Sequence, residues 1–72
     1  MNGKPVVDRN RRYSSTEIIE ILKAHGWTLK RIKGDHYHFF HPDLGGPLPV
    51  PHPKKDVPLG TQRNIFKRAG LL

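Results

Sequence analysis

Three histidines and three aromatic residues fill one short stretch of this chain, residues 36–41, which a proline follows. If the stretch is a β-strand, successive side chains point to opposite faces of the sheet. Burial of one face through Tyr37 and Phe39 would leave His36 and His38 exposed on the other face. Histidine is the side chain best suited to proton transfer near neutral pH. The stretch is therefore typical of a strand that carries an active site.

The same histidines have the spacing of a metal-binding cluster, His36-x-His38-x-x-His41. On a strand, however, His41 faces the side opposite to the other two. The chain has no cysteine, and no inward-facing carboxylate is expected nearby to complete a zinc site. We therefore expect no metal and no cofactor. His41 and His52 each precede a proline at a strand end, which favours packing or hydrogen-bonding roles for both.

The charge of the chain is strongly positive, with 13 lysines and arginines against six acidic residues and a formal net charge of +7. In a domain this small, such an excess indicates a polyanionic partner, most often nucleic acid. An acidic protein partner is the alternative explanation. Lys30 and Lys33 precede the histidines, and Lys54 and Lys55 follow them in an extended loop. We predict that these four lysines contact the phosphates of a nucleic acid.

The length of 72 residues allows one domain with a small hydrophobic core. The absence of cysteine excludes disulfides and fits a reducing compartment. The first residues contain no apolar run that could serve as a signal peptide or membrane span. We therefore expect a soluble, cytoplasmic protein with no membrane partner.

Two amphipathic helices are expected at the ends of the domain. Ser14 and Glu17 have the spacing of a capping box, and the apolar residues after them recur at helical intervals. This pattern predicts a helix over residues 15–25, ended by Gly26. Residues 58–69 place an apolar stripe opposite a basic one, which predicts a second helix.

Three strands are expected between the helices, over residues 27–32, 35–41 and 47–51. The turn at Lys33-Gly34 predicts a hairpin between the first two strands, and alternate prolines place the third strand at a sheet edge. Strict alternation would bury Arg31 and expose Ile32, a conflict that a twist or bulge would relieve. The element order predicts an α+β fold, α-β-β-β-α, with a three-stranded antiparallel sheet and both helices on one face. Double-stranded RNA-binding domains share this architecture.

Residues 1–13 carry four basic side chains against one acidic side chain and little that could pack. We expect them to form a flexible basic arm outside a folded domain of residues 14–72. The arm either touches RNA or a partner, or is a disordered tail.

Six short motifs occur in order along residues 14–72. They are Gly26-Trp27-x-Leu29, Lys33-Gly34-x-His36, Phe39-x-His41-Pro42, Val50-Pro51-His52-Pro53-Lys54-Lys55, Pro58-x-Gly60-Thr61 and Ala69-Gly70-Leu71. In this combination the chain resembles the HicA toxins. The resemblance implies a fold like that of double-stranded RNA-binding domains and an mRNA interferase, the ribonuclease half of a type II toxin–antitoxin pair. It also implies a HicB antitoxin that neutralises the toxin by covering its active face.

The resemblance implies that His36 is the catalytic histidine. Asp35 stands where the family most often has serine, and on a strand its side chain would point away from His36. RNA brings its own nucleophile, the 2′-hydroxyl, so the enzyme needs only a base, an acid and cations around the phosphate. His36 would act as the base or the acid, and cleavage would leave a cyclic phosphate and a 5′-hydroxyl. His38 is the nearest accessory group, unless it is an ordinary surface residue.

Two other classes of function compete with this interpretation. The first is an RNA-binding module of the same fold that does not cleave. The start of the second helix, Pro58-Leu59-Gly60-Thr61, argues against that module because it lacks the lysines with which such domains grip phosphates. The second is an interaction protein whose basic face serves only an acidic partner.

Overall fold

A computed structural model describes residues 6–72 of the chain. Five elements follow one another along it: α1 (Ser15–Ala24), β1 (Thr28–Lys33), β2 (His36–His41), β3 (Gly45–Pro51) and α2 (Leu59–Arg68). The strands form one antiparallel sheet in the order β1-β2-β3. The predicted α+β fold with the order α-β-β-β-α is confirmed.

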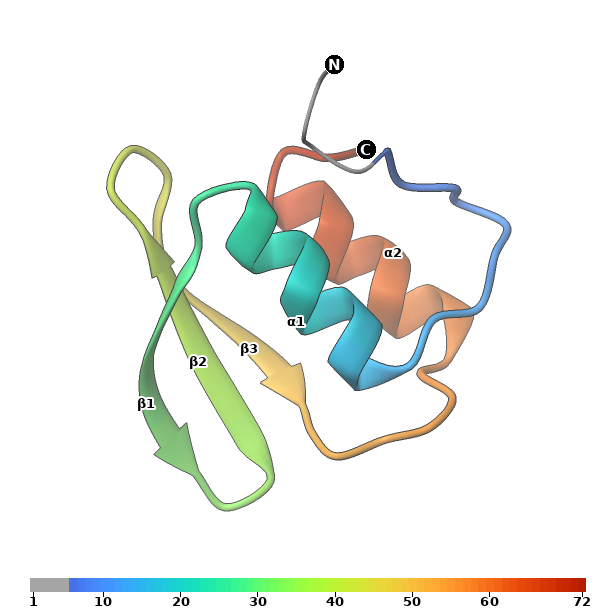
Figure 1. Cartoon of the computed structure of the whole chain (residues 1–72), viewed down its shortest axis with the longest axis horizontal. Helices are drawn as coiled ribbons and strands as arrows, with labels where there is room; N and C mark the ends of the chain where they lie inside the picture. The colour runs from blue at the N-terminus through green and yellow to red at the C-terminus, as the bar shows by residue number, and fades with distance from the viewer. Residues whose placement is uncertain (1–5) are drawn as a thin grey trace.

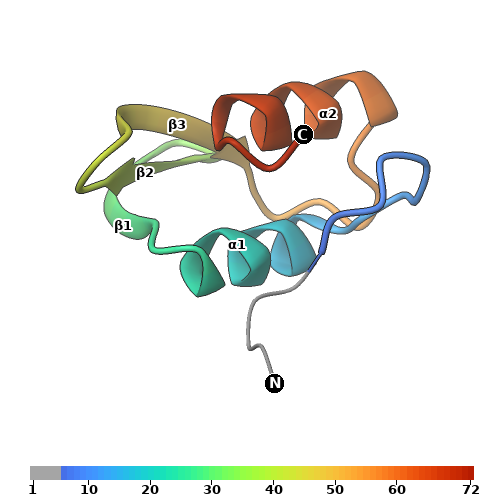
Figure 2. The same cartoon turned by 90° about the horizontal axis from the view of Figure 1, so that it is seen from above.

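The two helices lie side by side and run in the same direction (Figures 1 and 2). The register pairs Phe39 with Leu48 and Tyr37 with Val50, so these four side chains share one face of the sheet. Phe39, Leu48 and Val50 are fully buried, in the same cluster as the buried side chains of both helices. The sheet therefore has one face packed against the helices and one face turned away from them, as a small antiparallel sheet can.

The first helix begins and ends where its local sequence predicts. The backbone N–H of Glu17 donates to Ser14 Oγ over 3.1 Å, and the Ser14 N–H donates to Glu17 Oε1 over 2.9 Å. These two bonds form the predicted capping box. Gly26 has a φ of +95° just after the helix, and a side chain there would meet His41 Nε2 at 3.0 Å. The close approach adds a second reason for glycine at this position.

The hairpin between β1 and β2 turns on two residues, Gly34 and Asp35. Gly34 has a φ of +60° and Asp35 does not have a positive φ, which fits a type II′ turn with glycine at its first central position. The strands close on the pair Lys33 and His36. In Figure 1 this turn projects beyond the ends of both helices.

A β-bulge interrupts β1 between Leu29 and Arg31. Leu29 pairs with Phe39 and Arg31 pairs with His38, so Lys30 is the extra residue. The bulge moves Arg31 to the face turned away from the helices, where it is exposed. The predicted irregularity is confirmed, and it resolves the conflict that strict alternation created for Arg31.

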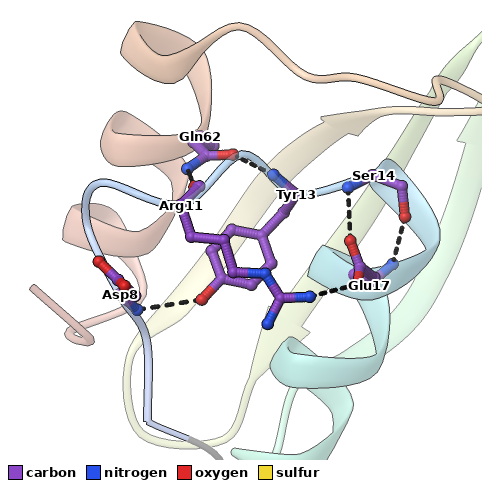
Figure 3. A network of polar contacts seen from close by, with 6 residues as sticks. All are labelled: Asp8, Arg11, Tyr13, Ser14, Glu17 and Gln62. Atoms are coloured by element: carbon purple, nitrogen blue, oxygen red, sulfur yellow. Dashed lines mark hydrogen bonds and ion pairs between the residues drawn. The ribbon is translucent and has the colours of Figure 1, made fainter.

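The segment before α1 packs along α2 (Figure 3). Tyr13 is buried in the core, with its ring edge-on to Phe66 at 5.4 Å between centroids. The buried Gln62 side chain accepts from the Tyr13 N–H over 2.9 Å and donates to the Arg11 carbonyl. Arg63 donates to the carbonyl of Arg9 over 2.9 Å.

The expectation that residues 1–13 contain little that could pack is therefore wrong for their last part. A buried glutamine needs hydrogen-bond partners, and the backbone at Arg11 and Tyr13 supplies them. Residues 1–5 of the expected arm lie outside the described residues, and the boundary at residue 14 stays a prediction.

Both helices have ten residues. No helix in the described part of the chain is long and apolar enough to cross a membrane.

Candidate active site

The sheet face turned away from the helices, here called the outer face, carries two basic and two imidazole side chains of the hairpin. The register sets Arg31 opposite His38 and Lys33 opposite His36. Directly opposite side chains on one face have Cβ atoms about 5 Å apart. Each of these histidines therefore has a cationic neighbour on the adjacent strand. On the other side β3 contributes only prolines to these rows.

His36 begins β2 at the projecting turn and is well exposed, with 54% of its side-chain surface accessible. Its Nδ1 lies 3.3 Å from Oδ1 of Asp35. In a neutral histidine whose Nδ1–H donates a hydrogen bond to a carboxylate, Nε2 carries the lone pair. The Asp35 carboxylate therefore stands beside Nδ1 of His36, and the exposed ring is open to a ligand on the outer face.

The contact corrects the expectation that Asp35 points away from His36. That expectation placed both residues on one strand, where neighbours face opposite sides. The strand begins one residue later, at His36, and Asp35 occupies the second position of the turn. Turn residues do not follow the alternation, so the carboxylate folds back onto the imidazole.

The predicted basic residues separate into different places. Lys33 lies beside His36 on the adjacent strand. Lys30 is the bulged residue, and it lies with Thr28, Phe40 and Pro42 toward the opposite end of the hairpin. The structure therefore does not bring Lys30 next to His36.

Arg31 is the basic residue that sequence reasoning missed. Strict alternation directs it inward, whereas the bulge directs it to the outer face opposite His38. The only signal in the sequence was the conflict itself, since a charged residue in an inward position costs too much to be buried unpaired. His38 is half-buried there, two residues along β2 from His36.

Lys54 and Lys55 are exposed in the loop after β3, against the start of α1. The Lys54 N–H donates to Ser15 Oγ over 2.8 Å, and the Ser15 N–H donates to the Lys54 carbonyl over 2.8 Å. The His52 N–H donates to the Asp35 carbonyl over 2.9 Å. The loop therefore runs from the hairpin turn to the helix, with its lysines anchored on the α1 side.

Comparison of the sequence with known protein families shows what this chain is similar to. The model of the HicA toxin of bacterial toxin–antitoxin systems matches residues 15–71. The chain belongs to the HicA toxin family. The comparison with curated proteins found no match. The matched range contains all five elements and His36, so the sheet and its outer face lie within the matched part of the chain.

Family membership makes the protein a toxin of a toxin–antitoxin system. HicA toxins are generally ribonucleases, and the family implies an RNA target and an antitoxin partner. The resemblance carried by the six motifs is thereby confirmed at the level of the family.

His41 and His52 of this HicA toxin each precede a proline. Both have the packing and hydrogen-bonding roles that the sequence predicts. His41 Nδ1 accepts backbone N–H groups from Asp43 over 3.0 Å and Leu44 over 3.2 Å. The ring proton is therefore on Nε2, which donates to the His25 carbonyl over 3.1 Å. The centroid of the His41 ring also lies 5.2 Å from the centroid of the Trp27 ring.

His52 is held from two sides. Its Nδ1 shares a hydrogen bond of 2.6 Å with Ser15 Oγ, which also accepts from the Lys54 N–H. Its ring sits edge-on to Tyr37 at 4.7 Å. Within residues 6–72, no three histidine or acidic side chains converge in a way that could hold a metal ion.

Proposed function

We propose that this HicA toxin is an endoribonuclease that cleaves mRNA through His36 without help from a metal ion. The observation that carries the proposal is the environment of His36, which is exposed, lies 3.3 Å from the Asp35 carboxylate and is adjacent to Lys33 on the outer face. A histidine positioned by a carboxylate is a common general base. The neighbouring cation suits a phosphate ligand.

The chemistry uses groups that RNA itself supplies. The 2′-hydroxyl next to the scissile phosphate loses its proton to Nε2 of His36 as the 2′-oxygen attacks phosphorus. The bond from phosphorus to the 5′-oxygen then breaks, and the leaving oxygen takes a proton. The products are a 2′,3′-cyclic phosphate and a 5′-hydroxyl. His38, on the same face, or water delivers the second proton, and Asp35 keeps the His36 ring in the tautomer that can accept the first.

Cationic side chains hold the phosphate and its developing charge. Lys33 and Arg31 lie on the outer face beside the histidines and are our first candidates. Lys54 and Lys55 extend the basic surface toward α1 and would bind flanking phosphates. Lys30 would contact RNA only further along the strand, away from the reacting phosphate.

The test is cleavage of a long single-stranded RNA by the purified protein in excess EDTA, alongside His36→Ala and His38→Ala. We expect cleavage by the wild type and none by His36→Ala, with RNA binding retained and the unfolding curve unchanged. Products should carry cyclic phosphate and 5′-hydroxyl ends, identified by end-labelling with and without phosphatase treatment. Binding without cleavage by the wild type would instead favour a non-catalytic RNA-binding module.

We further propose that a HicB-type antitoxin neutralises the toxin by covering the outer face. Such a partner should carry acidic groups, because the face that it covers is basic. A toxin of this kind predicts a neighbouring reading frame that encodes the antitoxin, and co-expression of the two should yield a stable complex that does not cleave RNA. A complex that leaves the cleavage rate unchanged would contradict this mode of neutralisation.

A further inference from the structure

The two edges of the sheet differ in how far they are open to another strand. β3 carries three prolines among its seven residues and packs against both helices. Proline cannot donate to a sheet ladder, so that edge is closed to strand addition. β1 contains no proline. Five of its six residues are exposed, and Leu29 is half-buried. The β1 side is therefore the open edge of this fold.

The hairpin geometry determines which backbone groups face the open edge. A two-residue turn closes on a hydrogen-bonded pair, here Lys33 and His36. Hydrogen-bonded and non-hydrogen-bonded pairs alternate along an antiparallel ladder. Ile32, opposite Tyr37, is then in a non-hydrogen-bonded pair. Its N–H and C=O point away from β2, toward any strand that would be added.

The side chains of β1 select what could be added. Ile32 lies on the helix side of the sheet but 53% of it is exposed, because the hairpin extends beyond the helices. Arg31 and Lys33 flank it on the outer face, and Lys30 stands at the bulge. Cationic side chains and bulges at an edge keep identical chains from pairing. The same charges attract an acidic strand.

We propose that the β1 edge accepts, as a fourth strand, an acidic segment of a partner protein in which apolar and acidic residues alternate. Its apolar side chains would pack on Ile32, and its carboxylates would face Arg31 and Lys33. Backbone hydrogen bonds would supply affinity and the alternating side chains specificity, as in other cases of strand addition.

Strand addition at this edge would also regulate the site, a step that rests on the proposed ribonuclease function. Neighbouring strands lie about 4.8 Å apart, so the added strand would be about 10 Å from β2. Its carboxylates would pair with Lys33, which stands directly beside His36. They would thereby compete with an RNA phosphate for the same cation.

The test uses the intact protein and a capped ten-residue peptide of alternating glutamate and valine, at millimolar concentration. Amide exchange measured by NMR should slow at Ile32 when the peptide is added. A peptide of alternating lysine and valine, and one with five glutamates followed by five valines, should leave that amide unchanged. The glutamate–valine peptide should also slow RNA cleavage.

Two variants make the test specific for the edge. Ile32→Pro removes the outward N–H without removing a bond to β2, and should weaken peptide binding by about tenfold. Ile32→Thr keeps the N–H and a β-branched side chain, and serves as the matched control with a loss of only a few-fold. If Ile32→Pro does not fold, the double change R31E and K33E should reverse the preference between the glutamate and lysine peptides.

Three results would each overturn the proposal. The peptide could bind the wild type and Ile32→Pro equally well. It could slow amide exchange only in β3 or the helices, or the Ile32 amide could be protected by self-association of the free chain. The binding readout does not depend on catalysis. Protection of Ile32 in a protein that cleaves no RNA would therefore preserve the strand site while the ribonuclease function fails. If the protein cleaves RNA but the peptide does not protect the Ile32 amide, the ribonuclease function stands and the strand site fails.

Discussion

The two ends of β2 carry the same residue type in opposite situations. At one end His41 has both ring nitrogens hydrogen-bonded to backbone groups and its ring against Trp27. At the other end His36 is exposed, and one of its nitrogens faces only the carboxylate of Asp35. The first histidine joins the end of α1 to the turn after β2. The second is the histidine that we propose for chemistry.

The difference follows from where each histidine lies relative to the helices. The β2–β3 end of the strand lies close to Gly26, where the chain leaves α1, and backbone groups surround the ring of His41 there. The β1–β2 turn projects beyond the helices (Figure 1), and His36 there is exposed beside the Asp35 carboxylate and Lys33. The neighbours of a histidine in a strand therefore decide whether it has a structural role or is free to react. Its position in the sequence pattern does not decide this. The following predictions test that assignment.

The largest effect is expected for His36→Ala. Removal of a general acid–base group costs about 10²- to 10⁴-fold in rate. Because the side chain is exposed, the free energy of unfolding should change by less than about 0.5 kcal/mol. Initial cleavage rates and urea titration measure the two quantities. A drop in stability that accounts for the lost activity would place His36 with the structural histidines.

His41→Ala should have the opposite signature. It leaves the His25 carbonyl and two backbone N–H groups without their partner, which should lower the free energy of unfolding by about 1–3 kcal/mol. The fraction that remains folded should cleave RNA at the normal rate. His38→Ala, a half-buried histidine of the same strand, is the matched control and should cost less than about 1 kcal/mol.

Lys33→Ala and Arg31→Ala should each weaken binding to single-stranded RNA by a few-fold. If each contacts one phosphate, each should reduce the slope of log K against log salt by about 0.7. Lys23→Ala, in the last turn of α1, is the control and should change neither quantity. Equal losses for all three variants would mean that RNA responds to net charge rather than to the outer face.

Asp35→Asn should slow cleavage by only about two- to fivefold. Its carboxylate is 80% exposed, and exposed ion pairs contribute little. Asp35→Ser, which places the residue that the resemblance to HicA toxins leads us to expect here, should fall in the same range. Asp43→Asn, in the turn beside His41, should leave the rate unchanged. A loss as large as that of His36→Ala would make Asp35 an essential part of the site.

The smallest effect concerns acid stability at the start of α1. The backbone N–H of Ser14 lowers the pKa of Glu17 below its ordinary value, with the charge of Arg11 contributing. A lowered pKa in the folded state gives stability that is present above the ordinary pKa and lost as pH falls through the folded value. Glu17→Gln should flatten the acid limb of the stability curve. It should leave the dependence of cleavage on pH near neutrality unchanged.

Local signals in the sequence predicted most of the fold. Ser14 with Glu17, Gly26 and the turn at Gly34 each depend on contacts within a few residues, and each is confirmed. The packing of Tyr13 was missed because its partner, Gln62, lies 49 residues away. A local sequence pattern does not predict a contact between residues this far apart in the chain.

The candidate site was predicted less completely. His36 followed from the family motif, but its surroundings depended on two shifts of a single residue. A one-residue shift reverses the face of every side chain in a strand. The bulge at Lys30 moved Arg31 outward, and the later start of β2 freed Asp35 to contact His36.

The most direct test of the account measures two quantities on two variants, His36→Ala and His41→Ala. The quantities are the rate of RNA cleavage per folded molecule in EDTA and the free energy of unfolding. We predict that His36→Ala loses the rate and keeps the stability, while His41→Ala keeps the rate and loses stability. If His36→Ala cleaves at the wild-type rate, or if both variants lose both quantities together, the assignment of His36 to chemistry is wrong.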